Sequence, residues 1–180
     1  TSIGENVFNS CTSLTKVFFE TPSSLISIGD NTFYYCKSLT KITIPFSVIS
    51  IGNNAFYGCS SLTEILFEAS SSLNSIRSCA FSECSSLTQI TIPSSVNFIG
   101  NNTFKNCSSL IQMTIPSSVT SIGDFAFIYC ESLTQITIPS SVTSIGNFSF
   151  SECFSLTEIT LPSSITSIGN NAFSECSSLT

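Results

Sequence analysis

Short stretches of alternating apolar and polar residues return along this chain at a nearly constant interval. The stretch LTQITIP, residues 133–139, alternates in this way and is rich in β-branched residues, so it predicts a short β-strand. Its leucine and two isoleucines are expected to point inward, whereas Gln135 and Thr137 are expected to point outward. Pro139 has no backbone N–H to donate to a neighbouring strand, and we therefore expect the strand to end there.

The stretch that follows, SSVTSIG at residues 140–146, predicts an extended return with Val142 and Ile145 directed inward. Gly146 suits a turn that needs a positive φ angle. Asn or Asp usually occupies the next position, and such residues favour the N-cap of a helix, so we expect a helical turn to start there. That capping position holds Asp30, Asn53, Ser78, Asn101, Asp124, Asn147 and Asn170.

The whole pattern is an internal repeat. A Phe-x-x-Cys motif occurs eight times, and successive copies lie 23 or 25 residues apart. Such a short and strict period is typical of a solenoid, in which each coil contacts only its neighbours. Stacked at the ~5 Å spacing of β-strands, the coils would form a parallel sheet along one side. The motif lies at Phe8/Cys11, Phe33/Cys36, Phe56/Cys59, Phe81/Cys84, Phe104/Cys107, Phe127/Cys130, Phe150/Cys153 and Phe173/Cys176.

Composition supports a folded domain and narrows its partners. Hydrophobic residues make up 42% of the chain, which argues against disorder, and only 9% of the residues are charged. The net charge is −6 and only five residues are Lys or Arg, which argues against a nucleic-acid partner. No apolar run approaches the ~18 residues of a membrane span. Both ends fall within a repeat, so we interpret residues 1–180 as a single domain of about eight coils, without caps, from a longer chain.

The sequence offers little for catalysis or metal binding. It contains no histidine, which excludes the usual activation of a Ser or Cys nucleophile. Its 11 Asp and Glu residues fall at scattered repeat positions, and a smooth solenoid offers no cleft in which a pair of them would converge. No C-x-x-C pair of the kind that holds zinc is present. We therefore predict no catalytic residue, no metal site and no cofactor.

Eight of the nine cysteines occupy one repeat position and should form a row along the stack. Parallel Cβ vectors would hold neighbouring sulfur atoms too far apart for a disulfide. We expect buried free thiols that act as small apolar side chains. Cys79 stands outside this row, near the start of a turn, where we expect more exposure. We interpret it as structural, with a reactive thiol as the alternative.

The outward-facing positions of the strands offer a candidate protein-binding face. In the C-terminal half they form uniform rows of Gln and Thr, whereas the N-terminal half also carries charges and the apolar residues Phe18 and Leu66. Variation at solvent positions can encode specificity in a repeat protein, since core positions are fixed by packing. The alternative is a solvated sheet face without a partner. The candidate residues are Lys16, Phe18, Lys41, Thr43, Glu64, Leu66, Gln89, Gln112 and Gln135.

An aromatic pair forms a second candidate surface. Phe125 and Phe148 occupy the same position in adjacent repeats, where Asn usually stands, so they should touch. Contiguous exposed apolar side chains mark interfaces, which makes the pair a candidate oligomer contact. Alternatively, the two rings fold down over the turn.

These residues resemble a known family. LTQITIP fits the L-x-x-L-x-L signature of leucine-rich repeats, and the 23-residue phrase that closes with IG-x-x-AF-x-x-C resembles the BspA-like, or Treponema-type, class. The resemblance implies a leucine-rich-repeat solenoid with a parallel β-sheet on the concave side and short extended segments and helical turns elsewhere. It also implies protein binding without catalysis, and in many members a microbial surface location with attachment to host or matrix proteins.

The sequence departs from the family pattern in two respects. The segments FFETPSS and LFEASSS, residues 18–24 and 66–72, belong to repeats with two extra residues. Arg77 stands where the other repeats have Gly, so we expect that turn to adopt another shape.

The predicted function is a non-enzymatic protein–protein interaction module for cell-surface adhesion or host contact. Its partners would be proteins, among them host or matrix proteins, and its location would be the cell surface or the membrane. An intracellular scaffold or regulator in the cytoplasm is the alternative, because many free thiols suit a reducing compartment. A third interpretation is a self-assembling array joined end to end through exposed strand edges.

Overall fold

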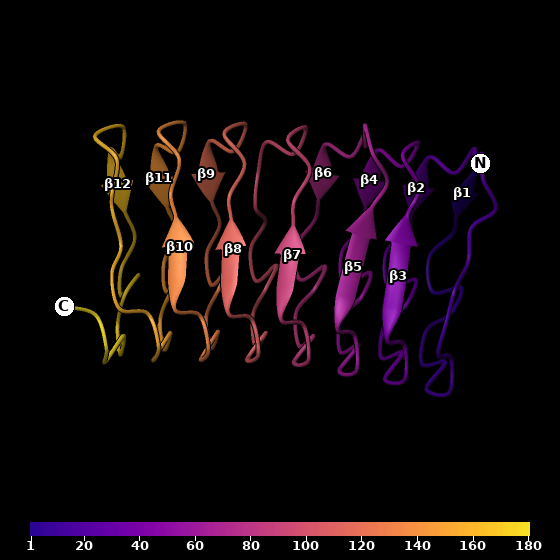
Figure 1. Cartoon of the computed structure of the whole chain (residues 1–180), viewed down its shortest axis with the longest axis horizontal. Helices are drawn as coiled ribbons and strands as arrows, with labels where there is room; N and C mark the ends of the chain where they lie inside the picture. Colours follow the sequence, from indigo (N-terminus) through magenta and orange to yellow (C-terminus); the bar gives the residue numbers. More distant parts are fainter.

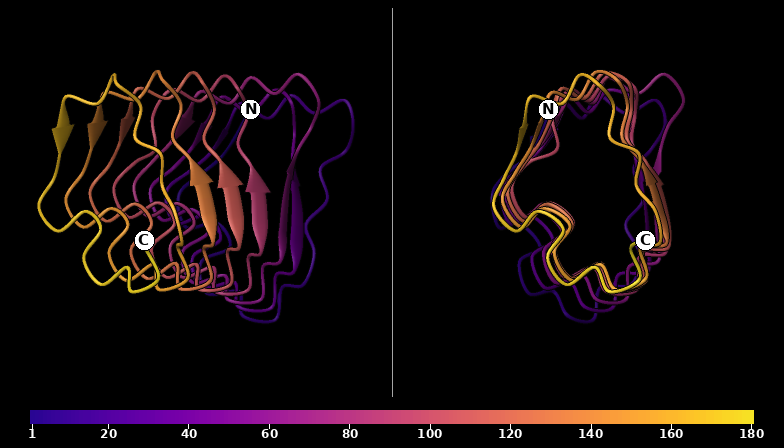
Figure 2. Two further views of the ribbon diagram at one scale, coloured as in Figure 1. Left: turned by 60° about the vertical axis from the view of Figure 1, so that its left-hand side comes forward. Right: turned by 90° about the vertical axis from the view of Figure 1, so that its left-hand side faces the viewer.

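The chain winds into one stack of coils with a row of short strands on each of two opposite sides (Figure 1). The computed structural model describes every residue from Thr1 to Thr180, and the chain makes about seven turns. The front row contains β3 (Lys41–Ile44), β5 (Glu64–Phe67), β7 (Gln89–Thr91), β8 (Gln112–Thr114) and β10 (Gln135–Thr137). The rear row contains β1 (Ser2–Ile3), β2 (Ser27–Ile28), β4 (Ser50–Ile51), β6 (Ser75–Ile76), β9 (Ser121–Ile122), β11 (Ser144–Ile145) and β12 (Ser167–Ile168). Viewed along the stack, most coils overlie one another closely (Figure 2).

All strand pairs are parallel and join equivalent positions of the repeat. On the front, β3 pairs with β5, and β8 lies between β7 and β10. On the rear, β1, β2, β4 and β6 form one sheet and β9, β11 and β12 form another. Single bridges from Ile99 to Ile76 and to Ile122 link the two rear sheets. The front strands confirm the predicted sheet, and the rear strands show that the extended return pairs with its neighbours as well.

The core is one continuous column of 43 buried residues. The side chains predicted to point inward in the unit 133–146 are all buried, with exposed fractions of 5% or less. The phenylalanines of the Phe-x-x-Cys motif stack ring on ring through this column, with neighbouring centroids 5.1–5.6 Å apart. Burying one such side chain stabilises a fold by about 1.5–3 kcal/mol, so the repeated apolar positions supply most of the driving force.

The turns that carry this motif are not helical, which corrects the sequence prediction. Two residues in each turn adopt the left-handed conformation, as at Asn31 and Tyr35, whose φ angles are both 53°. The N–H groups of Asn31, Phe33 and Tyr35 donate to carbonyls of the next coil at 2.7–2.9 Å, whereas that of Tyr34 donates within its own turn to Asn31 at 3.2 Å. Left-handed residues interrupt an α-helix. The turn is therefore a continuation of the hydrogen-bonded ladder between coils.

The Asn and Asp side chains that were expected to cap helices bridge neighbouring coils instead. Oδ1 of Asp124 accepts the backbone N–H of Asn147 at 2.6 Å, and Oδ1 of Asn147 accepts that of Asn170 at 2.8 Å. Oδ1 of Asn101 accepts the N–H of Asp124 at 2.9 Å. The capping prediction thus identified the acceptors correctly but placed their donors in the wrong coil.

Gly146 is required by a close approach between coils and not by its φ angle. A Cβ atom at Gly146 would lie 2.5 Å from the backbone nitrogen of Asp124 in the preceding coil. The first left-handed residue of that turn comes two positions later, at Phe148. The predicted positive φ of Gly146 is therefore wrong, and glycine recurs at this position because two backbones touch there.

The coil with Arg77 keeps the ordinary turn, contrary to the sequence prediction. Its left-handed residues, Cys79 and Glu83, occupy the same repeat positions as in the other turns. The next coil lies farther away at this point. A Cβ atom at Gly100 would lie 3.2 Å from the backbone nitrogen of Ser78, compared with 2.5 Å for the equivalent contact at Gly146. Ser78 also has no side-chain carbonyl, so the bridging row of Asn and Asp side chains is interrupted at this coil.

Replacing Gly146 with Ala should lower the free energy of unfolding by about 1–3 kcal/mol, because the new methyl group collides with backbone of the preceding coil. Gly4→Ala is the matched control, since Gly4 holds the same repeat position and a Cβ there would meet only a Val7 methyl group at 3.8 Å. Urea denaturation followed by circular dichroism measures both variants. Equal unfolding free energies would contradict the close-approach account.

Candidate protein-binding surface

The strands β3, β5, β7, β8 and β10, together with the segment 16–18 that is bridged to β3, present one face to solvent, which we call the front face. The outward residues of neighbouring strands lie side by side in register, with Lys41 opposite Glu64 and Gln112 between Gln89 and Gln135. The front face carries all nine residues proposed from the sequence to contact a partner. Glu64 is half-buried and the other eight are exposed: Lys16, Phe18, Lys41, Thr43, Leu66, Gln89, Gln112 and Gln135.

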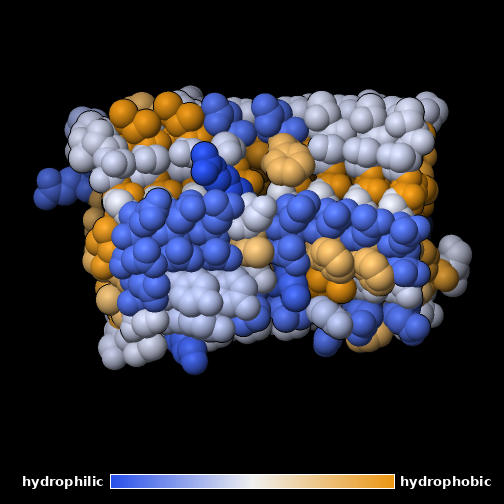
Figure 3. All heavy atoms as spheres, turned by 180° about the vertical axis from the view of Figure 1, so that it is seen from behind, coloured by the Kyte–Doolittle hydropathy of each residue, from blue (hydrophilic) through white to orange (hydrophobic).

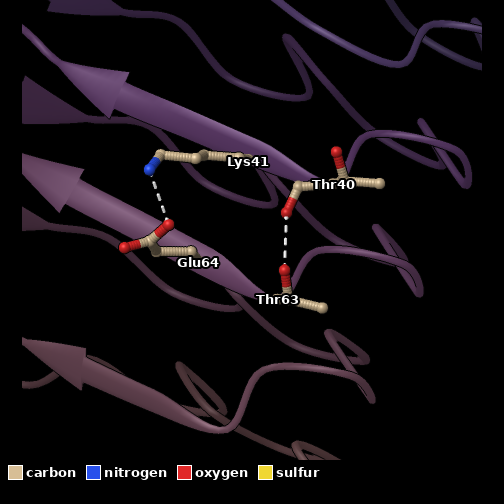
Figure 4. Close-up of polar contacts among 4 residues, drawn as sticks. All are labelled: Thr40, Lys41, Thr63 and Glu64. Carbon is tan, nitrogen blue, oxygen red and sulfur yellow. Dashed lines mark hydrogen bonds and ion pairs between the residues drawn. The ribbon is translucent and has the colours of Figure 1, made fainter.

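An ion pair joins two neighbouring coils on this face. Nζ of Lys41 lies 2.7 Å from a carboxylate oxygen of Glu64, and the hydroxyl of Thr63 donates to the Thr40 carbonyl at 3.1 Å (Figure 4). The Lys41 and Glu64 side chains are 52% and 41% exposed, and ion pairs at the surface contribute about 0–1 kcal/mol to stability. The pair orients the Lys41 ammonium without being essential to the fold. The neighbouring Lys16, bridged to Lys41 through the backbone, has no carboxylate partner.

An apolar cavity opens beside Lys16 and Lys41. Phe18 is 85% exposed, the highest value among the large apolar side chains. It borders a cavity of about 390 Å³. The cavity is therefore an apolar depression bordered by two lysines and one glutamate. Its lining consists of Lys16, Val17, Phe18, Phe19, Thr21, Lys41, Ile42, Thr43 and Glu68.

The front face is divided between β5 and β7, a feature that sequence reasoning missed. These two strands are adjacent along the stack but are not hydrogen-bonded to each other. A cavity of about 380 Å³ lies there, lined by segments 64–71 and 89–94. Glu68 lines both this cavity and the one beside Phe18, and its carboxylate accepts the N–H of Phe46 at 3.0 Å. The available signal was the lengthened repeat, because the extra residues follow β5 directly.

The C-terminal half of the front face is flatter and more uniform. The Gln and Thr rows of β7, β8 and β10 line a polar depression of about 260 Å³. No charged side chain borders it. The charged and aromatic side chains of the front face therefore lie around the two cavities of the N-terminal half.

The aromatic pair Phe125 and Phe148 lies on the turns and not on the front face. The rings of Phe125 and Phe148 stack with centroids 5.2 Å apart and planes within 5°, which confirms that they touch. Both side chains are half-buried and both residues are left-handed, with φ angles of 57° and 52°. Holding a bulky residue in the left-handed conformation costs about 1–2 kcal/mol of conformational free energy. Other turns have Asn at this position, so the fold itself does not require phenylalanine there. Seen from behind, the surface combines hydrophilic patches with rows and clusters of apolar residues (Figure 3).

The cysteine row provides hydrogen bonds as well as packing. All nine cysteines are free, and the Sγ atoms of seven of them donate to the carbonyl of a motif phenylalanine in the preceding coil at 3.0–3.3 Å. Burial raises the pKa of the Cys36 thiol to about 11 and that of Cys107 to about 12. Cys79, expected near the surface, is half-buried, and burial raises its pKa too. Raised pKa values leave few thiolates at neutral pH, so these groups are poor nucleophiles.

No three metal-ligating side chains come together anywhere in the structure. None of its segments forms a helix long and apolar enough to cross a lipid bilayer.

Sequence comparison matches the chain to the BspA type leucine-rich repeat region, in six copies, over residues 1–111 and 66–180. The chain belongs to the BspA-type leucine-rich repeat family. BspA-type repeats generally serve as non-enzymatic scaffolds for protein interaction. No curated protein matches the chain.

Solved structures of several other proteins share this architecture. The leucine-rich repeat protein of T. pallidum is 35% identical, with a TM-score of 0.82, and the match covers 87% of this chain and 72% of that protein. A leucine-rich cell surface protein of Faecalibacterium prausnitzii is 36% identical, with a TM-score of 0.69, over 89% of this chain and 42% of that one. The pneumococcal vaccine antigen PcpA, at 21% identity and a TM-score of 0.69, shares the fold over 99% of this chain and 58% of its own.

Thiol labelling should follow the burial of the BspA-type core. Iodoacetamide at pH 7.5 is expected to modify Cys11, the one exposed cysteine, and to leave Cys84, Cys107 and Cys130 intact in the folded protein. Peptide mass mapping quantifies each site, and the same reaction in denaturant, where all nine should react, is the control. Rapid modification of Cys107 without unfolding would contradict the buried, hydrogen-bonded row.

Proposed function

We propose that the N-terminal half of the front face binds protein partners, and that the protein is a non-enzymatic adhesion or host-contact module at a microbial cell surface. The observation that carries the proposal is the exposed Phe18 beside an apolar cavity, at a strand position where most other coils have Thr. A large exposed aromatic residue next to a cavity is a typical anchor for a protein partner. The F. prausnitzii neighbour, described as a cell surface protein, supports the location.

The charges around the cavity suggest the chemistry of the partner segment. Lys16 is unpaired, and Lys41 forms an exposed ion pair with Glu64. Glu68, the one carboxylate of the lining, already accepts the N–H of Phe46. An apolar side chain flanked by acidic residues would place its apolar part against Phe18 and its carboxylates near these ammonium groups. Such charge complementarity steers association and fixes orientation more than it adds affinity.

Two alternative functions, an intracellular scaffold and self-association, are each supported by a separate observation. Nine free thiols are compatible with a reducing compartment, which favours an intracellular scaffold as the second candidate. The strained and partly exposed stack of Phe125 and Phe148 supports a contact between two copies of the chain. Both alternatives leave the front face available for a protein partner.

Replacing Phe18 and Leu66 with Ser should reduce capture of a partner at least about tenfold, because anchors at the centre of an interface contribute more than 1 kcal/mol each. Biolayer interferometry against a panel of purified extracellular-matrix proteins measures the affinity. The matched control, Gln112→Ser with Thr114→Ser, alters the C-terminal half of the same face and should leave affinity unchanged.

Equal loss of affinity in both double variants would show that the site lies elsewhere on the face or spans it. Binding to cytosolic proteins but to none of the matrix panel would contradict the surface role and favour the scaffold.

A further inference from the structure

The turns form a second variable surface, along the lower edge of the molecule in Figure 1. The two positions that follow the motif phenylalanine differ from coil to coil more than any strand position, and they hold all four tyrosines of the chain. These tyrosines are Tyr34, Tyr35, Tyr57 and Tyr129. Three of them come together at the N-terminal end of this edge, and the front face is not involved.

The three N-terminal tyrosines hold one another in fixed orientations. The rings of Tyr34 and Tyr57 stack with centroids 5.1 Å apart, and Tyr35 meets them edge-on at 4.6 Å and 5.5 Å. The hydroxyl of Tyr57 donates to the Glu83 carboxylate at 2.5 Å, and this hydrogen bond raises the pKa of Tyr57. Offset and edge-on aromatic contacts of this kind each contribute about 0.5–1.5 kcal/mol. The cluster is therefore rigid before any ligand arrives.

Gly58 makes room for the Tyr35 ring. A Cβ atom at Gly58 would lie 2.3 Å from a ring carbon of Tyr35. The turn itself does not need glycine here, because Glu83 and Asn106 occupy the same repeat position with the same left-handed φ. Gly58 is thus explained by the placement of Tyr35 and not by the backbone.

Tyr35 and Gly58 lie at one end of an open polar groove of about 610 Å³. The hydrogen-bonding groups of this groove are largely unused: the amide of Asn106 and the carboxylate of Glu131 have no side-chain partner, and Glu83 uses one oxygen for Tyr57. Three serines stand at one repeat position in successive coils. The groove is lined by Tyr35, Lys37, Gly58, Ser60, Glu83, Ser85, Asn106, Ser108 and Glu131.

The charges of the groove argue against a strongly charged ligand. Lys37 would repel a cation, and Glu83 and Glu131 would repel an anion. Nζ of Lys37 lies 5.4 Å from the Tyr35 ring centroid, which shows that one face of the ring is accessible from the groove. The side chain of Lys37 is exposed and can swing aside. What remains is an accessible aromatic face beside hydroxyl, amide and carboxylate groups that both donate and accept hydrogen bonds.

We propose that this groove binds a neutral oligosaccharide. The C–H face of a pyranose ring carries partial positive charge and packs on the negative face of an aromatic ring, as Tyr35 offers. The hydroxyls of the sugar act as donors and acceptors together, which matches the mixture of Glu83, Asn106 and the serines. One coil adds one serine to the groove at the ~5 Å strand spacing, so an extended chain of sugars would meet equivalent groups along the stack.

Saturation-transfer difference NMR and isothermal titration with cellotetraose and chitotetraose test the proposal on the whole chain. At least one of these neutral tetrasaccharides should bind saturably. Tyr35→Ala should weaken binding about tenfold or more, through the lost aromatic face. Gly58→Asn should do the same while the fold is kept, because Asn is already accommodated at this position by Asn106 and its side chain would displace Tyr35.

Tyr129→Ala is the matched control, since Tyr129 holds the same repeat position outside the groove and its loss should leave affinity unchanged. Thermal denaturation of each variant establishes that it is folded, and Glu83→Gln is the further groove variant if Gly58→Asn unfolds. Absence of saturable binding by both tetrasaccharides would overturn the proposal, as would binding that survives Tyr35→Ala. Tenfold tighter binding of the cationic glucosamine tetramer than of chitotetraose would also overturn it and would identify an ammonium site.

Discussion

The distance between one coil and the next governs almost every feature of this molecule. Backbone N–H groups of the turns donate directly to carbonyls of the adjacent coil, as Phe33 does to Ala55 at 2.7 Å, and both rows of strands pair at the same interval. The phenylalanine rings stack at 5.1–5.6 Å only if that interval is kept. Gly146 is favoured for the same reason, because a Cβ atom there would lie 2.5 Å from backbone of the preceding coil. At Arg77 the backbone bonds between coils continue, but the row of bridging Asn and Asp side chains is interrupted at Ser78.

A core built in this way leaves the outward positions free to vary without disturbing the fold. On the front face, the variable residues Lys16 and Phe18 line one cavity. The second cavity lies where the sheet is divided between β5 and β7. On the turns it is used by the tyrosines and by Gly58, which alone among the residues at its repeat position lacks a side chain. Both surfaces begin in the N-terminal half, where the repeats are least regular, and the groove on the turns extends to Glu131.

The sequence predicted the inward positions correctly because one period governs both the pattern and the packing. Leu133, Ile136 and the motif phenylalanines recur at the interval of the coil, so the burial of Leu133, Ile136 and the six inner phenylalanines follows from the repeat alone. The turns were predicted wrongly because Asn and Asp favour helix caps and left-handed positions alike, and only the neighbouring coil decides between them. Glycine is ambiguous for a similar reason, since it permits either a positive φ or a close backbone approach. The groove at Tyr35 could not be predicted, because Gly58, Glu83 and Asn106 belong to three different coils that meet only when stacked.

Native-state hydrogen exchange measured residue by residue tests the governing role of the ladder most directly. The amide protons of Phe56, Phe104 and Phe127, which donate across coils at 2.7–2.8 Å, should exchange only as fast as the molecule unfolds globally. Their free energies of exchange should then equal the free energy of unfolding measured with urea. Exchange of these protons at the rate of exposed loop amides would contradict the account, because the turns would then be free loops and not rungs between coils.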